Sequence, residues 1–492
     1  MKIISIITFM VLFAGMTLVA AQDFPSDFLG SDFHKDRRDI LRTKMPGNSV
    51  AVFFANPVRN RANDTDYLYH QDPNFYYLTG YREPHAILLM FKDNQTDDNG
   101  DSFNEIAFVQ PRKTEDPTDR DSETWTGRRL GPTGFEEQLG IRPSFDNYLF
   151  EEYSIDFSKF DKVLFYDFMN DVRDTENEGD LYDLISWFKK KAGYPSGNAM
   201  EVEPIAGNLD TQTLDYFMGE MRGVKTKEEL ALLRKAIDIS CIAQVEVMKA
   251  IKPGMSEREI QGIHEFIYRK YQAEEEGYNS IVGAGHNGCI LHYIDNYKPV
   301  VEGKEMILMD LGAEYHGYTA DVTRTIPIDG KFSKEEKAIY DLVYQAQEAA
   351  IKACMPGIDY RIDLDAQIAR RIVNEGLADL KIIKRPDSPN SYYPHGLSHQ
   401  LGLDVHDLGG SKLRPGMVIT IEPGIYIPDN SPCDKKWWGI AVRIEDDLLV
   451  TENGCELLSD IAPRKSEEIE ALMAKPSPFD NIVLPELESS QN

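Results

Sequence analysis

The chain has 492 residues, of which 42% are hydrophobic and 10% aromatic, so its length predicts two or three domains with ample apolar material for their cores. Its formal net charge at pH 7 is −29, from 82 acidic and 53 basic residues. A surface with this much negative charge repels nucleic acid and anionic membranes, so neither is expected as a partner.

The first 21 residues predict an export signal. Lys2 is followed by an apolar run from Ile3 to about Ala21, and the run ends in the small residues of VAAQ. This favours a signal peptide over residues 1–21, with an uncleaved membrane anchor as the alternative. We therefore expect an exported protein, periplasmic or secreted, with no membrane contact after cleavage. The five cysteines are widely spaced and odd in number, which argues against a disulfide scaffold.

Residues 38–205 are predicted to form a smaller N-terminal domain of mixed α/β structure. The polar residues before it, from 22 to about 40, are predicted to be loose. A helix is expected from about 180 to 191, after a loop-rich stretch between 93 and 121. Runs rich in β-branched and aromatic residues predict the strands, namely SVAVFFA, FYYLTGY, AILLMFK, EIAFVQ and FDKVLFYDFM.

Residues 224–465 are predicted to form the second, larger domain. From Thr226, apolar residues recur at helical spacing with Glu-to-Lys pairs, which predicts its first helix. Further helices are expected over 333–353, capped by Ser333, and over 363–377. Strand-like hairpins alternate with them, which predicts an α+β fold with an antiparallel sheet and helices on its outer face. Residues 466–492 are predicted to be a polar tail with at most one short helix.

Several acidic residues of this domain lie in β-rich segments that contain few other polar residues. Asp310 ends the apolar run MILMDLG, Glu422 lies in VITIEPGIYI and Glu445 lies in GIAVRIEDDLLV. An isolated ionised carboxylate is costly to bury, so cations are expected beside these residues. For any one acid a surface position would be an equally good interpretation. The full set favours a metal site, and it consists of Asp310, Asp321, His399, Glu422 and Glu445.

Two predicted hairpins bring the four carboxylates together in pairs. A turn at 315–316 would place Asp310 opposite Asp321, with Cβ atoms roughly 4.5–5.5 Å apart. A second, longer hairpin would place Glu422 opposite Glu445. Four carboxylates and one imidazole can hold two divalent ions, and they suit Mn(II), Mg(II), Fe(II) or Co(II) better than structural zinc. Two such ions about 3.5–4 Å apart commonly hold the water that attacks in a hydrolytic reaction.

Five motifs resemble those of the pita-bread metallopeptidases, and most closely those of the aminopeptidase P group. In chain order they are YNSIVGAGHNGCILHY, LMDLGAEYHGYTADVTRT, HGLSHQLGLDVHD, TIEPGIY and VRIEDD. The resemblance covers about residues 38–465. It implies a pita-bread catalytic domain behind the family's N-terminal domain. It also implies a metallo-aminopeptidase that releases the N-terminal residue preceding proline from peptides, by attack of a hydroxide bridging two divalent ions, most often Mn(II).

The resemblance assigns the metal ligands residue by residue. Asp310 would bind one ion, His399 and Glu422 would bind the other, and Asp321 and Glu445 would bridge the two ions. Glu422 would also act as the general base that takes a proton from the attacking water.

Other residues match the family's substrate-binding groups. The catalytic histidines that contact the scissile carbonyl and the tetrahedral intermediate match His292 and His406. The proline pocket and its support match His395, Tyr426 and Arg443, and a tyrosine behind the ligands matches Tyr278. The spacing of the histidines at 395, 399 and 406 also fits a helical stripe, but Pro394 and the neighbouring glycines favour loop and strand.

Two motifs in the N-terminal half bear on assembly. In TWTGRRLG, Trp125 matches a tryptophan that reaches a neighbouring subunit's active site in oligomeric family members, so a homo-oligomer, dimer or tetramer, is expected. Packing of Trp125 within its own domain is the alternative. In QDPNFYYLTGY, Asn74 stands where many relatives carry an acidic residue, which leaves the contacts at this position open.

One glycine motif and two other functions offer alternatives to this interpretation. The glycines at 283, 285 and 288 spell GxGxxG, but the strand-like run CILHY follows them instead of a helix, so nucleotide binding is not expected. The close rival to the aminopeptidase is prolidase, which cuts only dipeptides ending in proline and shares all five ligands. The second rival is a non-catalytic pita-bread binding protein, and retention of the five ligands argues against it.

Overall fold

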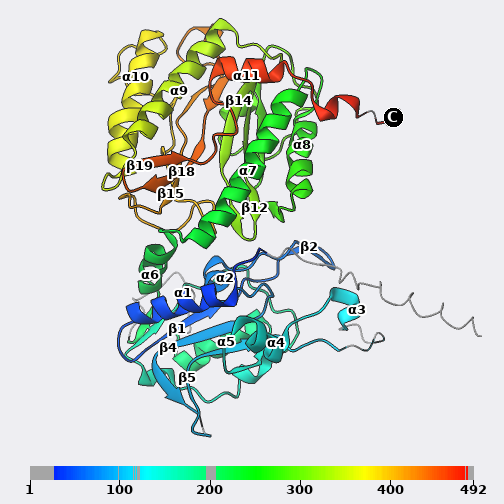
Figure 1. Cartoon of the computed structure of the whole chain (residues 1–492), viewed down its shortest axis with the longest axis vertical. Helices are drawn as coiled ribbons and strands as arrows, with labels where there is room; N and C mark the ends of the chain where they lie inside the picture. The colour runs from blue at the N-terminus through cyan, green and yellow to red at the C-terminus, as the bar shows by residue number, and fades with distance from the viewer. Residues whose placement is uncertain are drawn as a thin grey trace, which may run out of the picture.

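The computed structural model describes residues 27–97, 99–114, 116, 118, 122–195, 207–482 and 484–485, so the predicted signal peptide lies outside the described part. Two domains follow one another along the chain, and helix α6 (Thr213–Arg222) lies between them (Figure 1). No helix among the described residues is both long and apolar enough to cross a membrane.

The N-terminal domain is built on a six-stranded mixed sheet with the order β6-β5-β4-β1-β7-β8. Alternate residues of β1 point to opposite faces. Ala51 and Phe53 share a core with helices α1 and α2, whereas Val50 and Val52 pack with α5. The strands are β1 (Ser49–Phe54), β4 (Ile87–Thr96), β5 (Ser102–Val109), β6 (Ser144–Asp146), β7 (Lys162–Leu164) and β8 (Leu209–Asp210), with a separate hairpin of β2 (Asn60–Ala62) and β3 (Thr65–Asp66).

Two sequence predictions in this domain are wrong. Residues 31–40 are not loose, because helix α1 runs over Ser31–Lys44 and buries Leu41. The run FYYLTGY is not a strand but most of helix α2 (Pro73–Thr79). Asp72 caps this helix by accepting a 2.8 Å hydrogen bond from the Phe75 amide, and Gly80 ends it with φ 72°. These end signals outweigh the β propensity of the aromatic residues.

The predicted helix over 180–191 is confirmed by α5 (Leu181–Ala192). The other elements of the N-terminal domain are short. They are α3 (Glu123–Thr126), α4 (Gly131–Leu139), η1 (Asn147–Phe150) and η2 (Phe157–Lys159).

Helices of the second domain begin where the sequence predicted. Thr226 and Ser333 each form a capping box, with Glu229 and Glu336 respectively, at the starts of α7 (Lys227–Ala250) and α9 (Lys334–Ala353). The helix predicted over 363–377 is instead a π-helix, η4, that continues into α10. The remaining helical elements are α8 (Glu257–Lys270), η3 (Gly285–Cys289), η4 (Tyr360–Ala369), α10 (Arg370–Asp379), η5 (Lys435–Trp437), α11 (Ser466–Met473) and η6 (Pro478–Asn481).

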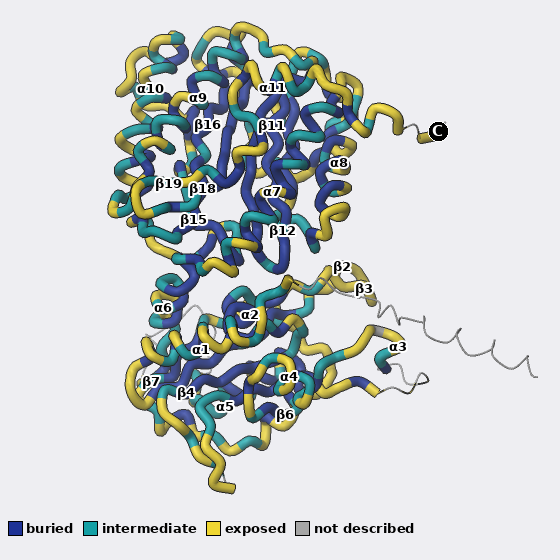
Figure 2. Tube along the Cα trace, viewed as in Figure 1, coloured by how far each residue is buried: buried dark blue, intermediate teal, exposed yellow. Residues whose placement is uncertain are grey.

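Antiparallel strands fill the centre of this domain, as predicted, and α7, α8, α9 and α10 lie around them (Figures 1 and 2). The two halves of the sheet meet where the Glu445 amide donates a 3.1 Å hydrogen bond to the Thr323 carbonyl. The strands are β9 (Glu275–Glu276), β10 (Ile281–Ala284), β11 (Met306–Leu311), β12 (Ala313–Tyr315), β13 (Tyr318–Thr319), β14 (Val322–Pro327), β15 (Val418–Ile421), β16 (Gly424–Ile427), β17 (Ile440–Arg443), β18 (Asp446–Thr451) and β19 (Gly454–Leu457).

The first predicted hairpin exists, but its register differs from the prediction. The turn is His316–Gly317, with φ 52° and 84°, as a type I′ turn requires. Asp310 therefore faces Thr323 and lies diagonal to Asp321. Because a two-residue shift keeps every side chain on its original face, the two aspartates still share one face.

The second hairpin has the predicted register. Ile421 pairs with Asp446 at the end of β15, and Gly424 pairs with Arg443 at the start of β16. This common register places Glu422 opposite Glu445, between the β15–β18 pair and the β16–β17 pair.

The ends of the described chain are attached to the second domain. The carboxylate of Asp27 lies 2.9 Å from Lys235 Nζ and 2.8 Å from His316 Nε2, and the ring of Phe28 stacks on His316 at 3.6 Å. At the other end, α11 is the one short helix that the sequence allowed within residues 466–492. It buries Ile469 in the main core, so this part of the predicted tail packs on the second domain.

Candidate active site

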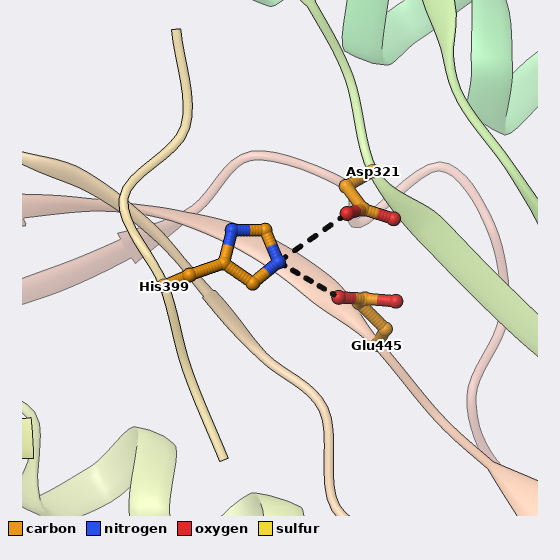
Figure 3. A group of neighbouring side chains, drawn as sticks. All are labelled: Asp321, His399 and Glu445. Carbon is orange, nitrogen blue, oxygen red and sulfur yellow. Dashed lines mark ion pairs between the residues drawn. The ribbon is translucent and has the colours of Figure 1, made fainter. Parts of the chain in front are cut away.

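Three ligand-type side chains converge at the centre of the second domain. His399 Nε2 lies 3.4 Å from Oδ2 of Asp321 and 3.9 Å from Oε1 of Glu445 (Figure 3). One ligand atom from each of these residues falls within 4.8 Å of the other two, which is a spacing that one metal ion can span. Asp321 follows β13, Glu445 lies between β17 and β18, and His399 lies in the loop before β15, so three separate segments build the cluster.

The other two predicted ligands border this group. Oε1 of Glu422 lies 3.7 Å from His399 Nε2. Asp310 is connected to the group through Tyr278. The Tyr278 hydroxyl lies 2.6 Å from Oδ1 of Asp310 and 2.6 Å from Oδ1 of Asp321. The structure therefore brings all five predicted ligands together.

Negative charge is in excess in this cluster. Burial raises the pKa of Glu422 to about 8, against the opposing effects of His399 and Arg443. Burial and the neighbouring carboxylates raise the pKa of Glu445 well above its usual value. The pKa of His399 is raised to about 9, because Asp321 and Glu422 outweigh burial. In the absence of a cation, the raised pKa values of Glu422 and Glu445 favour their protonated forms, and that of His399 favours the charged imidazole.

The residues fit divalent metal ions. The Tyr278 hydroxyl carries one hydrogen but contacts two carboxylate oxygens, so one of these oxygens lacks a donor from it. Nδ1 of His399 lies 3.0 Å from the Gln400 carbonyl, which fixes the tautomer that leaves Nε2 free to bind a metal. Four carboxylates and one imidazole are a donor set for hard or borderline divalent ions.

Two buried glutamines, which sequence analysis missed, hold the ligand-bearing strands. The side-chain amide of Gln244 in α7 donates to the carbonyls of Met309 and Val322, at 3.1 and 2.9 Å. The amide of Gln347 in α9 donates to the carbonyls of Ile421 and Ile444, both at 3.0 Å. Each acceptor adjoins a predicted ligand in sequence, so the two helices brace the two carboxylate pairs in the same way. The only sequence signal was a glutamine on an apolar helix face.

Arg443, Tyr426 and His395 form a hydrogen-bonded row beside the cluster. Arg443 bonds to Asp310 and donates at 2.7 Å to the Tyr426 hydroxyl, which lies 2.8 Å from His395 Nε2. Nδ1 of His395 lies 3.4 Å from Glu422. Burial and Arg443 lower the pKa of His395 to about 3, so its neutral ring can accept the Tyr426 proton. These hydrogen bonds fix the three side chains along one side of the cluster.

The two predicted catalytic histidines lie on the open side of the cluster. His406 is exposed, and its ring centroid lies 4.2 Å from that of His399. His292 is also exposed and contributes to lowering the pKa of both His395 and His406, after the larger effect of burial. His292 follows a 3₁₀ helix and lies in a turn, so the strand predicted for CILHY is wrong.

Trp125 is the one predicted substrate-binding residue that the structure does not bring to the cluster. It lies in α3, in the other domain, and its side chain is 66% exposed. The alternative, a tryptophan packed inside its own domain, therefore does not describe it.

Comparison with known proteins places these features in a family. A family model described as metallopeptidase family M24 matches residues 231–452, and one described as the aminopeptidase P N-terminal domain matches residues 34–163. The Xaa-Pro aminopeptidase of Escherichia coli is 34% identical over 91% of this chain and 98% of its own length. The chain belongs to metallopeptidase family M24.

Other relatives of this M24 metallopeptidase carry two kinds of name. The Xaa-Pro aminopeptidase of Haemophilus influenzae is 35% identical over 89% of the chain and 96% of its own length. Intermediate cleaving peptidase 55 of Arabidopsis thaliana, a mitochondrial protein, is 30% identical over 89% of the chain and 82% of its own length.

A solved structure supports the fold. Aminopeptidase P of Escherichia coli with the inhibitor Pro-Leu superposes with a TM-score of 0.76, 32% identity and coverage of 91% of this chain and 98% of that one. The pita-bread fold with its preceding N-terminal domain is thereby confirmed, as is the metallopeptidase class.

Proposed function

We propose that this M24 metallopeptidase is an Xaa-Pro aminopeptidase, which releases the N-terminal residue that precedes proline. The observation that carries the proposal is the convergence of Asp310, Asp321, His399, Glu422 and Glu445 in a chain that matches relatives of that name over nearly its whole length.

The five residues are proposed to hold two divalent ions, to which Asp321 and Glu445 would contribute from the centre of the cluster. Ions bound there would supply Lewis acidity and lower the pKa of a coordinated water. Glu422, partly buried beside His399, is placed to accept a proton from the attacking water and to return it to the leaving nitrogen. His292 and His406, on the open side, are proposed to donate hydrogen bonds to the scissile carbonyl.

Selection of proline is proposed to depend on shape. The imide nitrogen of proline offers no N–H for recognition. The row of Arg443, Tyr426 and His395 presents a fixed aromatic and imidazole surface beside Glu422, against which a pyrrolidine ring can pack.

The decisive experiment compares substrates. Purified enzyme would be assayed on Xaa-Pro-Yaa peptides of increasing length, on the Gly-Pro dipeptide and on Xaa-Ala-Yaa peptides. The proposal expects cleavage of the longer peptides with proline second. Cleavage of the dipeptide alone would identify a prolidase, and faster cleavage of alanine peptides would point to the specificity of an intermediate cleaving peptidase. Metal binding without hydrolysis of any peptide would indicate a non-catalytic binding protein.

Manganese is proposed as the working metal, because the donor set is dominated by carboxylates, which Mn(II) accepts readily. Metal-free protein reconstituted with Mn(II) should hydrolyse peptides faster than protein reconstituted with Zn(II). A higher kcat with Zn(II) would contradict this choice.

A homo-oligomer is proposed because Trp125 is exposed on α3, where it is free to contact another subunit. Light scattering should give a dimer or tetramer, and Trp125→Ala should raise KM. Full activity of a monomer would contradict the assembly.

Export is proposed from the basic and apolar N-terminal residues, which lie outside the described part of the chain. N-terminal sequencing of the protein from its native compartment should begin near Gln22. A chain that retains Met1 in the cytoplasm would contradict export.

A further inference from the structure

Arg222, at the end of α6, connects three segments from a fully buried position. Its side chain donates to Oδ1 of Asn74 in α2 at 2.7 Å, to Oδ2 of Asp404 at 2.6 Å and to Oδ1 of Asp407 at 2.5 Å. Lys225 donates to the other oxygen of Asp407 at 3.0 Å. The contacts tie the N-terminal domain to the loop that follows His399.

Two cations, Arg222 and Lys225, bond to two carboxylates, Asp404 and Asp407, and the buried carboxyl of Asp72 lies near Arg222 as well. Although burial raises it, the pKa of Asp407 stays below its usual value because Arg222 and Lys225 lower it more. The uncharged Asn74 is the third acceptor of Arg222.

The two carboxylates stand on either side of His406 in sequence. The loop closes on itself, since the Asp407 amide donates to the Gln400 carbonyl at 2.9 Å. Gly402 permits a very close approach, because a Cβ there would lie 2.0 Å from Oδ2 of Asp407. His406 is thus carried on a tight loop whose two ends are held by Arg222.

Leu403 packs this loop into the main core, whereas His406 itself is exposed. Asp404 and His406 line a cavity of about 370 Å³ that also borders His70 of the N-terminal domain. Atoms that face a cavity lack neighbours on that side, so the position of His406 depends on the residues of the loop that are held, which include Leu403, Asp404 and Asp407.

We propose that Arg222 is a positioning residue, which holds His406 in place for hydrolysis. It does so by bonding to Asp404 and Asp407 on either side of His406. Arg222 in turn takes its position from Asn74 of the N-terminal domain. The inference rests on the proposed function, because it assigns His406 to the scissile carbonyl. It makes docking of the N-terminal domain a requirement for catalysis within one subunit.

The test uses Asp404→Asn in the full-length, metal-loaded enzyme. Asp404 is partly exposed, at 45% of its side chain, so the variant should fold. Loss of this ion pair should lower kcat on an Xaa-Pro-Yaa peptide about 10- to 100-fold, as expected for a displaced catalytic group, with metal content unchanged. Asn74→Ala, in the other domain, should lower kcat in the same direction. The matched control is Glu220→Gln. Glu220 of α6 forms a 3.0 Å ion pair with Arg414, and the exposure of this pair is similar to that of Asp404. The pair does not involve the loop that carries His406.

A double-mutant cycle separates this idea from a general structural effect. If Arg222 acts through His406, Asp404→Asn should lower kcat no further in a His406→Ala background. An equal fold-loss in both backgrounds would overturn the inference, as would an equal loss from Glu220→Gln. Failure of the wild-type enzyme to cleave any Xaa-Pro peptide would instead overturn the proposed function.

Discussion

His399 Nε2 lies 3.4 Å from Oδ2 of Asp321, while Nδ1 of the same ring is occupied by a backbone carbonyl. The imidazole therefore presents a single free nitrogen to the carboxylates, which is the arrangement of a metal ligand whose tautomer is fixed by its neighbour. The following predictions test what this geometry implies.

Glu422→Gln should abolish most of the hydrolytic activity. The amide keeps the shape of the side chain but cannot accept a proton from water, so kcat should fall about 10²- to 10⁴-fold. Steady-state kinetics with metal content measured by mass spectrometry would check this. Wild-type kcat in a fully metal-loaded variant would refute the role of Glu422 as general base.

Tyr278→Phe should weaken metal binding. Removal of the hydroxyl frees Asp310 and Asp321 from their shared partner, so metal affinity should fall about 10- to 100-fold in a chelator competition assay. Tyr318→Phe is the matched control, because its buried hydroxyl bonds to Glu229 away from the cluster. Equal losses of affinity in both variants would argue against a specific role for Tyr278.

Stability of the metal-free protein should fall as pH rises from about 7 to 9. Folding raises the pKa of Glu422 from 4.5 to about 8 and that of His399 from 6.5 to about 9. Above pH 7 the folded state holds protons on these two groups that the unfolded state has released, so the free energy of unfolding decreases with pH. Buried histidines with a lowered pKa, such as His395 at about 3, oppose this trend only at lower pH, because above pH 7 they are largely neutral in both states. Calorimetry at pH 7 and 8.5 would measure the decrease.

Two comparisons make the pH prediction specific. Divalent metal should raise Tm more at pH 8.5 than at pH 5.5, because it replaces the bound protons. Glu422→Gln should reduce the pH dependence of the metal-free protein. A Tm that rises between pH 7 and 8.5 in the metal-free wild type would contradict the charge excess in the cluster.

Gln347→Leu should destabilise the fold by about 2 kcal/mol or more, since it leaves buried strand carbonyls and Oδ2 of Asp446 without their donor. Urea unfolding would measure the change. Gln367→Leu is the control, because the Gln367 amide bonds only to Asp363 on the surface and should change stability by less than about 0.5 kcal/mol. Similar effects of the two substitutions would show that the brace is not needed.

Local chemistry decided which parts of the structure could be predicted from the sequence. The capping boxes at Thr226 and Ser333 depend on residues three positions apart, so both helix starts were predicted correctly. The Asp310 hairpin was two residues out of register because the turn lies at His316–Gly317, yet its ligands kept their face.

Long-range contacts limited the rest of the prediction. One error was local instead: FYYLTGY has strand composition, and the caps at Asp72 and Gly80 make it a helix. Gln244, Gln347 and Arg222 gave almost no sequence signal, because their partners lie 65 or more positions away along the chain. The candidate metal ligands could be identified, whereas the residues that hold them in place could not.

The contacts of Asp27 and Phe28 with His316 have a practical consequence for expression vectors. A chain shortened to begin at Leu29 would lose both an ion pair and a ring stack that join its start to the catalytic domain. A purification tag that replaces these residues would not restore either contact. The C-terminal end of the described chain projects away from the domain boundary (Figure 1), so a tag placed there leaves the two-domain arrangement undisturbed.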